Sequence, residues 1–250
     1  NVTRQYLDIQ QRLRFYLTTP GVCPYLPDLD ERKVFTSLEE AADPSALNDS
    51  LTQAGFRRSQ RIAYRPACDG CNACISARIP VADFDMSRQW RRILNKNSNL
   101  SAHLTPAKAT EEQFWLLRRY RESRHLDGGM ADMTMLDYAS MVEETPVRTF
   151  VIEYRDTHTG DLVAAALTDA LGDGLSMVYS FYDPSEARQS VGSYIILDHI
   201  RKAAKAKLPY VYLGYWVRNS EKMGYKARFK PLEVLTPAGW RELDLEIHGR

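Results

Sequence analysis

The second half of this 250-residue chain alternates strand-like and helix-like segments, and their order constrains the fold more than any other feature. Three apolar runs, VRTFVIEYR, LVAAALTDAL and LSMVYSFYD, are joined by DTHTGD and GDG, which are typical hairpin connections. Residues 190–207 then carry apolar side chains at helical spacing, and residues 209–217 have the pattern of a buried strand. A helix between two neighbouring strands is a crossover, which favours parallel pairing. The order predicts an antiparallel meander extended by one parallel strand.

Two further helices are predicted before the meander, at EEQFWLLRRYRESR, with Thr110 as its cap, and at MLDYASMVEE. A capped short helix ending near Gly224 and a last strand in PLEVLTPAGWREL are predicted after it. This order resembles the N-acetyltransferase-like (GNAT) fold, in which an acyl donor lies where two central strands part. We therefore expect an α+β chain with a mixed sheet: a GNAT-like domain over residues 96–250, preceded by a small cysteine-containing domain over residues 1–95.

The four cysteines are distributed unevenly. Cys68, Cys71 and Cys74 stand three residues apart in RPACDGCNACISARIP, and Cys23 lies in TPGVCPYLPD. No apolar run approaches the roughly 18 residues that span a bilayer, and the N-terminus lacks the apolar core of a secretory signal. We therefore expect a cytoplasmic protein with no membrane partner, in which the clustered cysteines are metal ligands or catalytic thiols rather than disulfides.

Four thiols are the number that a tetrahedral zinc ion or a four-iron cluster requires, and a tight turn at Gly70 would let them converge. The C-x2-C-x2-C spacing favours an iron–sulfur cluster over zinc. The flanking Arg65 and Arg78 are expected to lower the pKa of the thiols. Reduced structural cysteines without metal are the alternative.

Basic side chains are segregated along the chain, although the formal net charge is only +1. Residues 57–96 contain nine basic and three acidic side chains, and residues 201–230 contain nine basic and one acidic. Two such blocks suggest a polyanionic partner. Two solvated surface faces are the alternative, and composition alone does not choose between them.

The segment RQSVGSY, at the start of the helix over 190–207, concerns the identity of the donor. Acetyltransferases of the GNAT fold hold a pyrophosphate here in a turn of the form Q/R-x-x-G-x-G/A. Gln189 and Gly192 match this pattern, but Tyr194 replaces a small residue and is expected to block a phosphate. Acetyl-CoA is therefore disfavoured. An aminoacyl-tRNA is the alternative donor, and it would explain the basic blocks.

Several stretches resemble the aminoacyl-tRNA–protein transferase family, which includes the arginyltransferases of eukaryotes and their bacterial relatives. They are CPYLPD, GFRRSQRIAYRPACDGCNACISARIPV, RQWRRILNKN, YSFYDP, SVGSYIILDHI and YLGYWVRNSEKMGYKARFKP. The form RPACDGCNAC…RIPV is similar to the bacterial branch, which moves leucine from Leu-tRNA to proteins that begin with Asp or Glu and marks them for degradation. The resemblance implies this activity, with Arg-tRNA as the alternative donor. Relatives in the family are also thought to bind an iron–sulfur cluster.

The implied reaction is the attack of an α-amine on the ester that joins an amino acid to the tRNA 3′ end. An α-amine has a pKa of about 8, so a neutral fraction exists at pH 7. The step then needs mainly positioning, a weak base and an oxyanion donor. No cofactor is expected for the transfer step, and the sequence has no Ser–His–Asp or Cys–His signature.

The candidate catalytic residues come from segments that the expected fold brings to the parted strands. They are Tyr179, Ser180 and Asp183 at the end of the third strand, Ser190 at the start of the helix, and Tyr215 and Asn219 in and after the next strand. Asp183 is the first candidate for a base or an amine anchor. An ordinary Asp-Pro turn is the alternative.

The candidate binding residues are cations and one tyrosine. They are Arg65, Arg78 and Lys222 for the acidic side chain of the acceptor, Arg88, Arg91 and Arg92 for tRNA phosphates, and Tyr225 and Lys226 for the unpaired 3′ end. Two other functions stay open: an acetyltransferase acting on amines, which the fold favours, and a non-catalytic, metal-dependent nucleic-acid-binding module, which the cysteines and arginines favour. The oligomeric state is not indicated.

Overall fold

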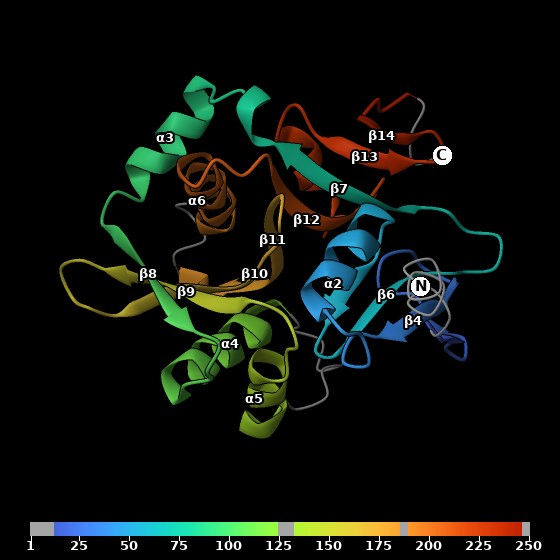
Figure 1. Ribbon diagram of the computed structural model, residues 1–250. Helices are drawn as coiled ribbons and strands as arrows, with labels where there is room; N and C mark the ends of the chain where they lie inside the picture. Colours follow the sequence, from blue (N-terminus) through green and yellow to red (C-terminus); the bar gives the residue numbers. More distant parts are fainter. Residues whose placement is uncertain (1–12, 125–132, 186–189, 247–250) are drawn as a thin grey trace, which may run out of the picture.

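An eight-stranded mixed sheet forms the centre of the computed structural model, which describes residues 13–124, 133–185 and 190–246 (Figure 1). Its strand order is β14-β13-β7-β12-β11-β10-β9-β8. In chain order the strands are β7 (Cys74–Pro80), β8 (Leu100–Pro106), β9 (Thr149–Asp156), β10 (Leu162–Ala170), β11 (Gly174–Tyr182), β12 (Tyr210–Val217), β13 (Glu233–Thr236) and β14 (Gly239–Glu242). The antiparallel meander β9–β10–β11 and the parallel β11–β12 pair confirm the predicted mixed sheet of GNAT-like order.

A smaller sheet from the N-terminal segment has the order β1-β4-β6-β5. Its elements are β1 (Phe15–Leu17), β4 (Lys33–Ser37), β5 (Arg57–Ser59) and β6 (Ile62–Pro66), accompanied by the β2 (Gly21–Val22) and β3 (Asp30–Glu31) pair and by helix α2 (Pro44–Gln53). Arg58 of β5 forms a buried ion pair of 2.6 Å with Asp169 of β10, which joins the two sheets. Because β7 also leaves this segment to pair with β12 in the main sheet, the boundary between residues 95 and 96 stays a prediction.

Helices cover both faces of the main sheet (Figure 1). The short η1 (Val81–Asp83) leads into α3 (Arg88–Lys96), which lies with α6 (Val191–Lys205) on one face, and α4 (Glu111–Arg124) and α5 (Met135–Glu143) lie on the other. The predicted cap of α4 is confirmed, since the hydroxyl of Thr110 accepts a hydrogen bond from the Gln113 amide at 3.1 Å.

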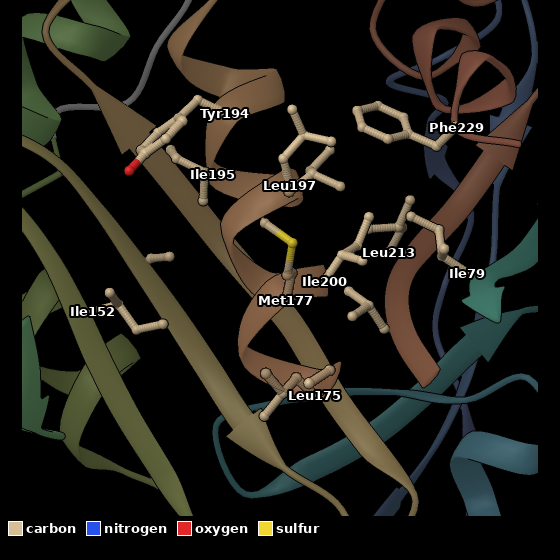
Figure 2. Packing of buried hydrophobic residues seen from close by; sticks show 14 of the residues in the cluster. Ile79, Ile152, Leu175, Met177, Tyr194, Ile195, Leu197, Ile200, Leu213 and Phe229 are labelled. Atoms are coloured by element: carbon tan, nitrogen blue, oxygen red, sulfur yellow. The ribbon is translucent and has the colours of Figure 1, made fainter. Parts of the chain in front are cut away.

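The buried face of α6 fixes this helix over the junction of β11 and β12 (Figure 2). Ile200 points from the helix toward Met177 of β11 and Leu213 of β12, whereas Leu197 lies toward Phe229, and all belong to one buried cluster. Burying each such side chain contributes about 1.5–3 kcal/mol. The start of α6 is therefore held beside the C-terminal ends of both strands.

The parallel β11–β12 pair is short. Its register matches Gly174 with Tyr210 and ends where Ser176 faces Tyr212. Beyond that point β12 pairs only with β7, and a register shift next to Gly214, which has a φ of +77°, bends it. The two central strands therefore part, and the resulting gap lies at the N-terminus of α6.

Two local predictions are wrong. The helical segment near Gly224 begins rather than ends there, as the 3-10 helix η3 (Gly224–Arg228). The expected last strand is the hairpin of β13 and β14, because Gly239 adopts a φ of +99° and turns the chain. Gln189 lies outside the described residues. Within the described part of the chain, no helix has both the length and the apolar character to cross a membrane.

Candidate functional site

A cleft of about 480 Å³ opens where β11 and β12 part. Its walls are formed by β11, the first turn of α6, the end of α4 and the segment 221–228. The cationic side chains on the walls are Arg57, Arg124, Lys222, Lys226 and Arg228. The tyrosines on the walls are Tyr120, Tyr179, Tyr182 and Tyr225. Among the described lining residues, the acidic one is Glu221. Such a surface suits an anionic ligand that carries flat rings, because cations neutralise phosphates and aromatic faces stack on bases.

Arg57 extends from β5 of the small sheet into the gap between the parted strands. Its Nη2 donates to the carbonyl oxygens of Met177 at 3.1 Å and Val178 at 3.2 Å, both on β11. On the β12 side its guanidinium lies against Gly214, where any Cβ would overlap it. Parted strands leave carbonyls without sheet partners, and an unsatisfied buried carbonyl costs about 1–3 kcal/mol. Arg57 therefore stabilises the open form of the sheet.

Lys226 has the same role on the opposite strand. Its Nζ donates to the carbonyl oxygens of Leu213 at 2.7 Å and Tyr215 at 2.6 Å, both on β12. The side chain is buried, and burial together with the charge of Arg57 lowers the pKa of Lys226 to about 7. In the cleft, Arg57 thus places a permanent positive charge beside an amine whose pKa is near neutral.

Arg124, the last residue of α4, crosses the opposite wall of the cleft. Its guanidinium lies 4.9 Å from the ring centre of Tyr120 and 5.8 Å from that of Tyr182, and its Nη2 donates to the Tyr182 hydroxyl at 2.7 Å. Tyr182 also faces the first turn of α6, because a Cβ on Gly192 would stand 3.3 Å from its ring. Tyr182 therefore connects α4 to α6 across the cleft.

Three of the six predicted catalytic residues, Tyr179, Ser180 and Ser190, line the cleft. Ser190 precedes α6 with a φ of +59°, and its side chain makes no capping hydrogen bond. This side chain therefore does not satisfy the amides of the first turn of α6, whose residues Val191, Gly192 and Ser193 line the cleft.

The other three predicted catalytic residues are not among the cleft-lining residues. Asp183 accepts hydrogen bonds from the amide and hydroxyl of Ser185 at 3.0 and 2.8 Å, so it forms the Asp-Pro turn that was the alternative. The hydroxyl of Tyr215 donates to the carbonyl of Gly55 at 3.0 Å inside the protein. Asn219 is exposed in a turn with a φ of +62°.

Among the candidates for the acceptor and the tRNA 3′ end, Lys222, Tyr225 and Lys226 line the cleft, whereas Arg65 and Arg78 do not. Arg78 is buried, donates to Glu233 at 2.7 Å, and lies 3.6 Å from the ring centre of Tyr210. Arg65 lies on β6, over the ring of Phe56. Arg78 is therefore used inside the fold, Arg65 is exposed on β6, and neither contributes to the cleft.

The three arginines of α3, namely Arg88, Arg91 and Arg92, are exposed. Arg91 lines a second hollow of about 470 Å³ between α3 and α6, together with Tyr194 and Arg201. The Tyr194 ring packs on Tyr154 with ring centres 5.8 Å apart, so it is not among the residues that line the main cleft. Tyr194 therefore does not block a phosphate in the main cleft, contrary to the expectation from the sequence.

The four cysteines gather next to the start of β7. Burial, and then the thiols of Cys23, Cys68 and Cys71, raise the pKa of Cys74 to about 12, which contradicts the expected lowering by Arg65 and Arg78. Both arginines make their contacts elsewhere. Gly70 has a φ of +68°, as the predicted tight turn requires.

The cysteine set fits a soft metal in number and chemistry. Two backbone amides already donate to it, from Leu26 to Cys23 Sγ at 3.4 Å and from Arg32 to Cys68 Sγ at 3.5 Å. Nevertheless, no three His, Cys, Asp or Glu side chains in the described ranges have the arrangement that would hold a metal ion. The thiols are near one another, but they do not have a metal-binding arrangement.

Sequence reasoning missed Arg57, Arg124 and Tyr120. Tyr120 and Arg124 are four residues apart in RRYRESR, and the i, i+4 spacing shows that they share a helix face. Arg57 gave no such signal, because its contacts with β11 and β12 join segments far apart in the sequence.

Comparison with known proteins gives consistent matches. The family model described as "Arginine-tRNA-protein transferase, C terminus" matches residues 112–236, and the corresponding N-terminus model matches residues 21–92. An aspartate/glutamate leucyltransferase of Phenylobacterium zucineum (strain HLK1) is 60% identical over 234 residues, which cover 92% of this chain and 91% of that protein. One from Caulobacter vibrioides (strain NA1000 / CB15N) is 61% identical over 243 residues, which cover 96% and 87%. A crystal structure of FemX aligns with a TM-score of 0.47 at 8% identity, over 73% of this chain and 63% of that one.

The contact between Gly214 and Arg57 predicts that Gly214→Ala destabilises the protein through two effects. Alanine at positive φ costs about 1–2 kcal/mol, and displacing Arg57 would leave the carbonyls of Met177 and Val178 unsatisfied, at about 1–3 kcal/mol. The matched control is Gly160→Ala, because Gly160 has the same φ of +77° but nothing within 4 Å of its would-be Cβ. Urea unfolding should show a clearly larger loss for Gly214→Ala. Equal losses would mean that Arg57 does not depend on this glycine.

The lowered pKa of Lys226 predicts a pH dependence of stability. Unfolding restores its ordinary pKa of 10.5, so between pH 7 and 10.5 the unfolded chain binds a proton that the native protein lacks. In that window the stability of the wild type should rise with pH relative to Lys226→Met, approaching a tenfold change in the folding constant per pH unit. Denaturant unfolding at pH 7.5, 8.5 and 9.5 measures this, and a constant difference between the two proteins would contradict it.

Proposed function

We propose a function for this chain on the premise that it belongs to the arginine-tRNA–protein transferase family and is a transferase. It moves leucine from Leu-tRNA to the α-amine of proteins that begin with Asp or Glu, and Arg-tRNA is the alternative donor. The observation that carries this proposal is the basic, tyrosine-lined cleft at the parted ends of β11 and β12. The modified proteins would be marked for degradation, in the cytoplasm.

The cleft has separate groups for the reacting ester and for the tRNA 3′ end that carries it. At the first turn of α6, where Ser190 provides no side-chain cap, the backbone amides beside Gly192 would donate to the ester carbonyl as it gains negative charge. The exposed Lys222 and Arg228 suit the phosphates near the tRNA 3′ end, and Tyr225 offers a face for an unpaired base. This arrangement would hold the ester in place while the acceptor amine approaches.

The proposed chemistry is a simple exchange of bonds. The amine nitrogen forms the new amide bond, the bond from the carbonyl carbon to the ribose oxygen breaks, and a proton moves from the amine to that oxygen. Lys226 replaces Asp183 as our candidate proton carrier, because it lines the cleft and has a pKa of about 7. The hydroxyl groups of Tyr179 and Ser180, which line the cleft from β11, are our candidates for relaying the proton.

The body of the tRNA would be held by α3. Arg88, Arg91 and Arg92 are exposed on this helix, and the first turn of α3 has no acidic residue to compete for them. Arginine contacts with phosphates supply affinity without reading sequence, so they suit the acceptor stem of any charged adaptor.

A transfer assay tests the proposed function. The purified chain is incubated with radiolabelled Leu-tRNA or Arg-tRNA and with peptides that begin with Asp, Glu or Ala. Leucine should appear on the Asp and Glu peptides and not on the Ala peptide. Absence of transfer from both tRNAs, together with turnover of acetyl-CoA, would favour the acetyltransferase alternative. Absence of both, with retained tRNA binding, would favour the binding module.

We also propose that Cys23, Cys68, Cys71 and Cys74 bind an iron–sulfur cluster, or zinc as the alternative, as a structural or redox-sensitive element outside the cleft. The proximity of the four thiols and the two amide donors to Cys23 and Cys68 supports this. The bound metal would offset the repulsion among thiolates, and the transfer step requires none of its chemistry.

Metal analysis of anaerobically purified protein tests the cysteine proposal. Iron and acid-labile sulfide should accompany the wild type and be absent from Cys71→Ser. Zinc without sulfide would select the alternative. Absence of both metals from anaerobic wild type would mean that the cysteines are structural.

A further inference from the structure

We propose that Arg124 binds the side-chain carboxylate of the acceptor, the group that N-terminal Asp and Glu share. This inference rests on the proposed function and names the residue that selects its acceptors. Arg124 closes α4 and lies on the wall of the cleft opposite the first turn of α6. Since α4 and α6 cover opposite faces of the sheet, the acceptor and the aminoacyl ester would enter from opposite sides (Figure 1).

The orientation of Arg124 is fixed before any ligand arrives. Its guanidinium lies 4.9 Å from the ring centre of Tyr120, and the Tyr182 hydroxyl accepts one of its five N–H donors at 2.7 Å. A planar guanidinium held by these two contacts can offer a two-pronged hydrogen bond to a carboxylate with little loss of side-chain entropy. A lysine at this place would lack both the stacking and the fork.

The charge of Arg124 also has no acidic partner within the described parts of the chain, where the shortest contact of its guanidinium is with a neutral phenol. Two other cations of the cleft, Arg57 and the buried Lys226, differ in this respect. Arg57 and Lys226 donate to backbone carbonyls of the parted strands, and those bonds hold the cleft open. Lys222 and Arg228 belong to the segment 221–228, so an anionic group that enters the cleft from the α4 side meets Arg124, whose charge is not engaged by the sheet.

Tyr182 sets the distance between the carboxylate and the reacting amine. Its hydroxyl contacts Arg124, and its ring contacts Gly192 at the start of α6. The carboxylate and the α-amine of an N-terminal Asp or Glu are separated by only a few bonds, so a carboxylate on Arg124 would hold the amine near the amides of α6. The side chains of aspartate and glutamate differ in length by one methylene, and the guanidinium of a long arginine side chain can shift enough to bind either carboxylate.

Steady-state transfer by Arg124→Gln tests this inference. The variant keeps a hydrogen-bonding group but removes the charge and the fork. Because a hydrogen bond to a charged group is worth about 1.5–3 kcal/mol, the KM for an Asp-started peptide should rise about 10- to 150-fold. The KM for Leu-tRNA should stay within about twofold, because the ester contacts are at α6. The preference for an Asp-started over an Asn-started peptide should fall by a similar factor.

The matched control is Arg118→Gln on the same helix. Arg118 is exposed and pairs with Glu122 at 3.2 Å, a contact that contributes little, so its loss should leave both KM values unchanged. An Arg124→Gln variant with unchanged peptide KM and unchanged Asp-to-Asn preference would overturn the inference while the proposed function stands. An equal rise in both KM values would also overturn it, because it would indicate a structural role. Absence of leucine transfer by the wild type would overturn the proposed function itself.

Discussion

The cleft depends on hydrogen-bond donors for the backbone carbonyls that the parted strands leave unpaired. A sheet whose central strands part must leave backbone carbonyls without strand partners, and carbonyls buried in that way are costly. Here two side chains supply the missing donors: Arg57 serves Met177 and Val178 on β11, and Lys226 serves Leu213 and Tyr215 on β12. The opening is therefore a built feature of the sheet.

The same solution determines the electrostatics of the site. The donors that satisfy the carbonyls are both cationic, and their mutual repulsion and burial weaken the hold of Lys226 on its proton. A backbone requirement thus produces a positively charged cleft with one group that can exchange protons near pH 7. Arg124 adds a further positive charge from α4, and its contacts are with the tyrosines Tyr120 and Tyr182 rather than with the backbone. Arg57 and Lys226 therefore support the sheet, whereas Arg124 is the cation that we propose binds the acceptor.

The sequence predicted the elements that depend on local or regular patterns. The periodicity of residues 190–207, the cap at Thr110 and the strand–helix–strand order all describe interactions within short stretches, and each is present. Tyr179, Ser180 and Ser190 reached the cleft because the order of elements was right. Asp183 did not, because an aspartate before proline can satisfy itself in its own turn, and the sequence does not distinguish that use from catalysis. Arg57 and Arg78 depend on which strands become neighbours, and no local pattern records that.

The position of β7 has a consequence for how the chain is made. This strand, from residues 74–80, lies in the middle of the main sheet between β12 and β13, which are both encoded near the other end of the chain. A nascent chain emerging from the ribosome therefore presents β7, and the cysteines before it, long before their partners exist. Assembly must wait until synthesis is almost complete, and such distant pairing is slow. A chaperone or a cofactor-loading protein would have that whole interval in which to act on the exposed cysteine segment.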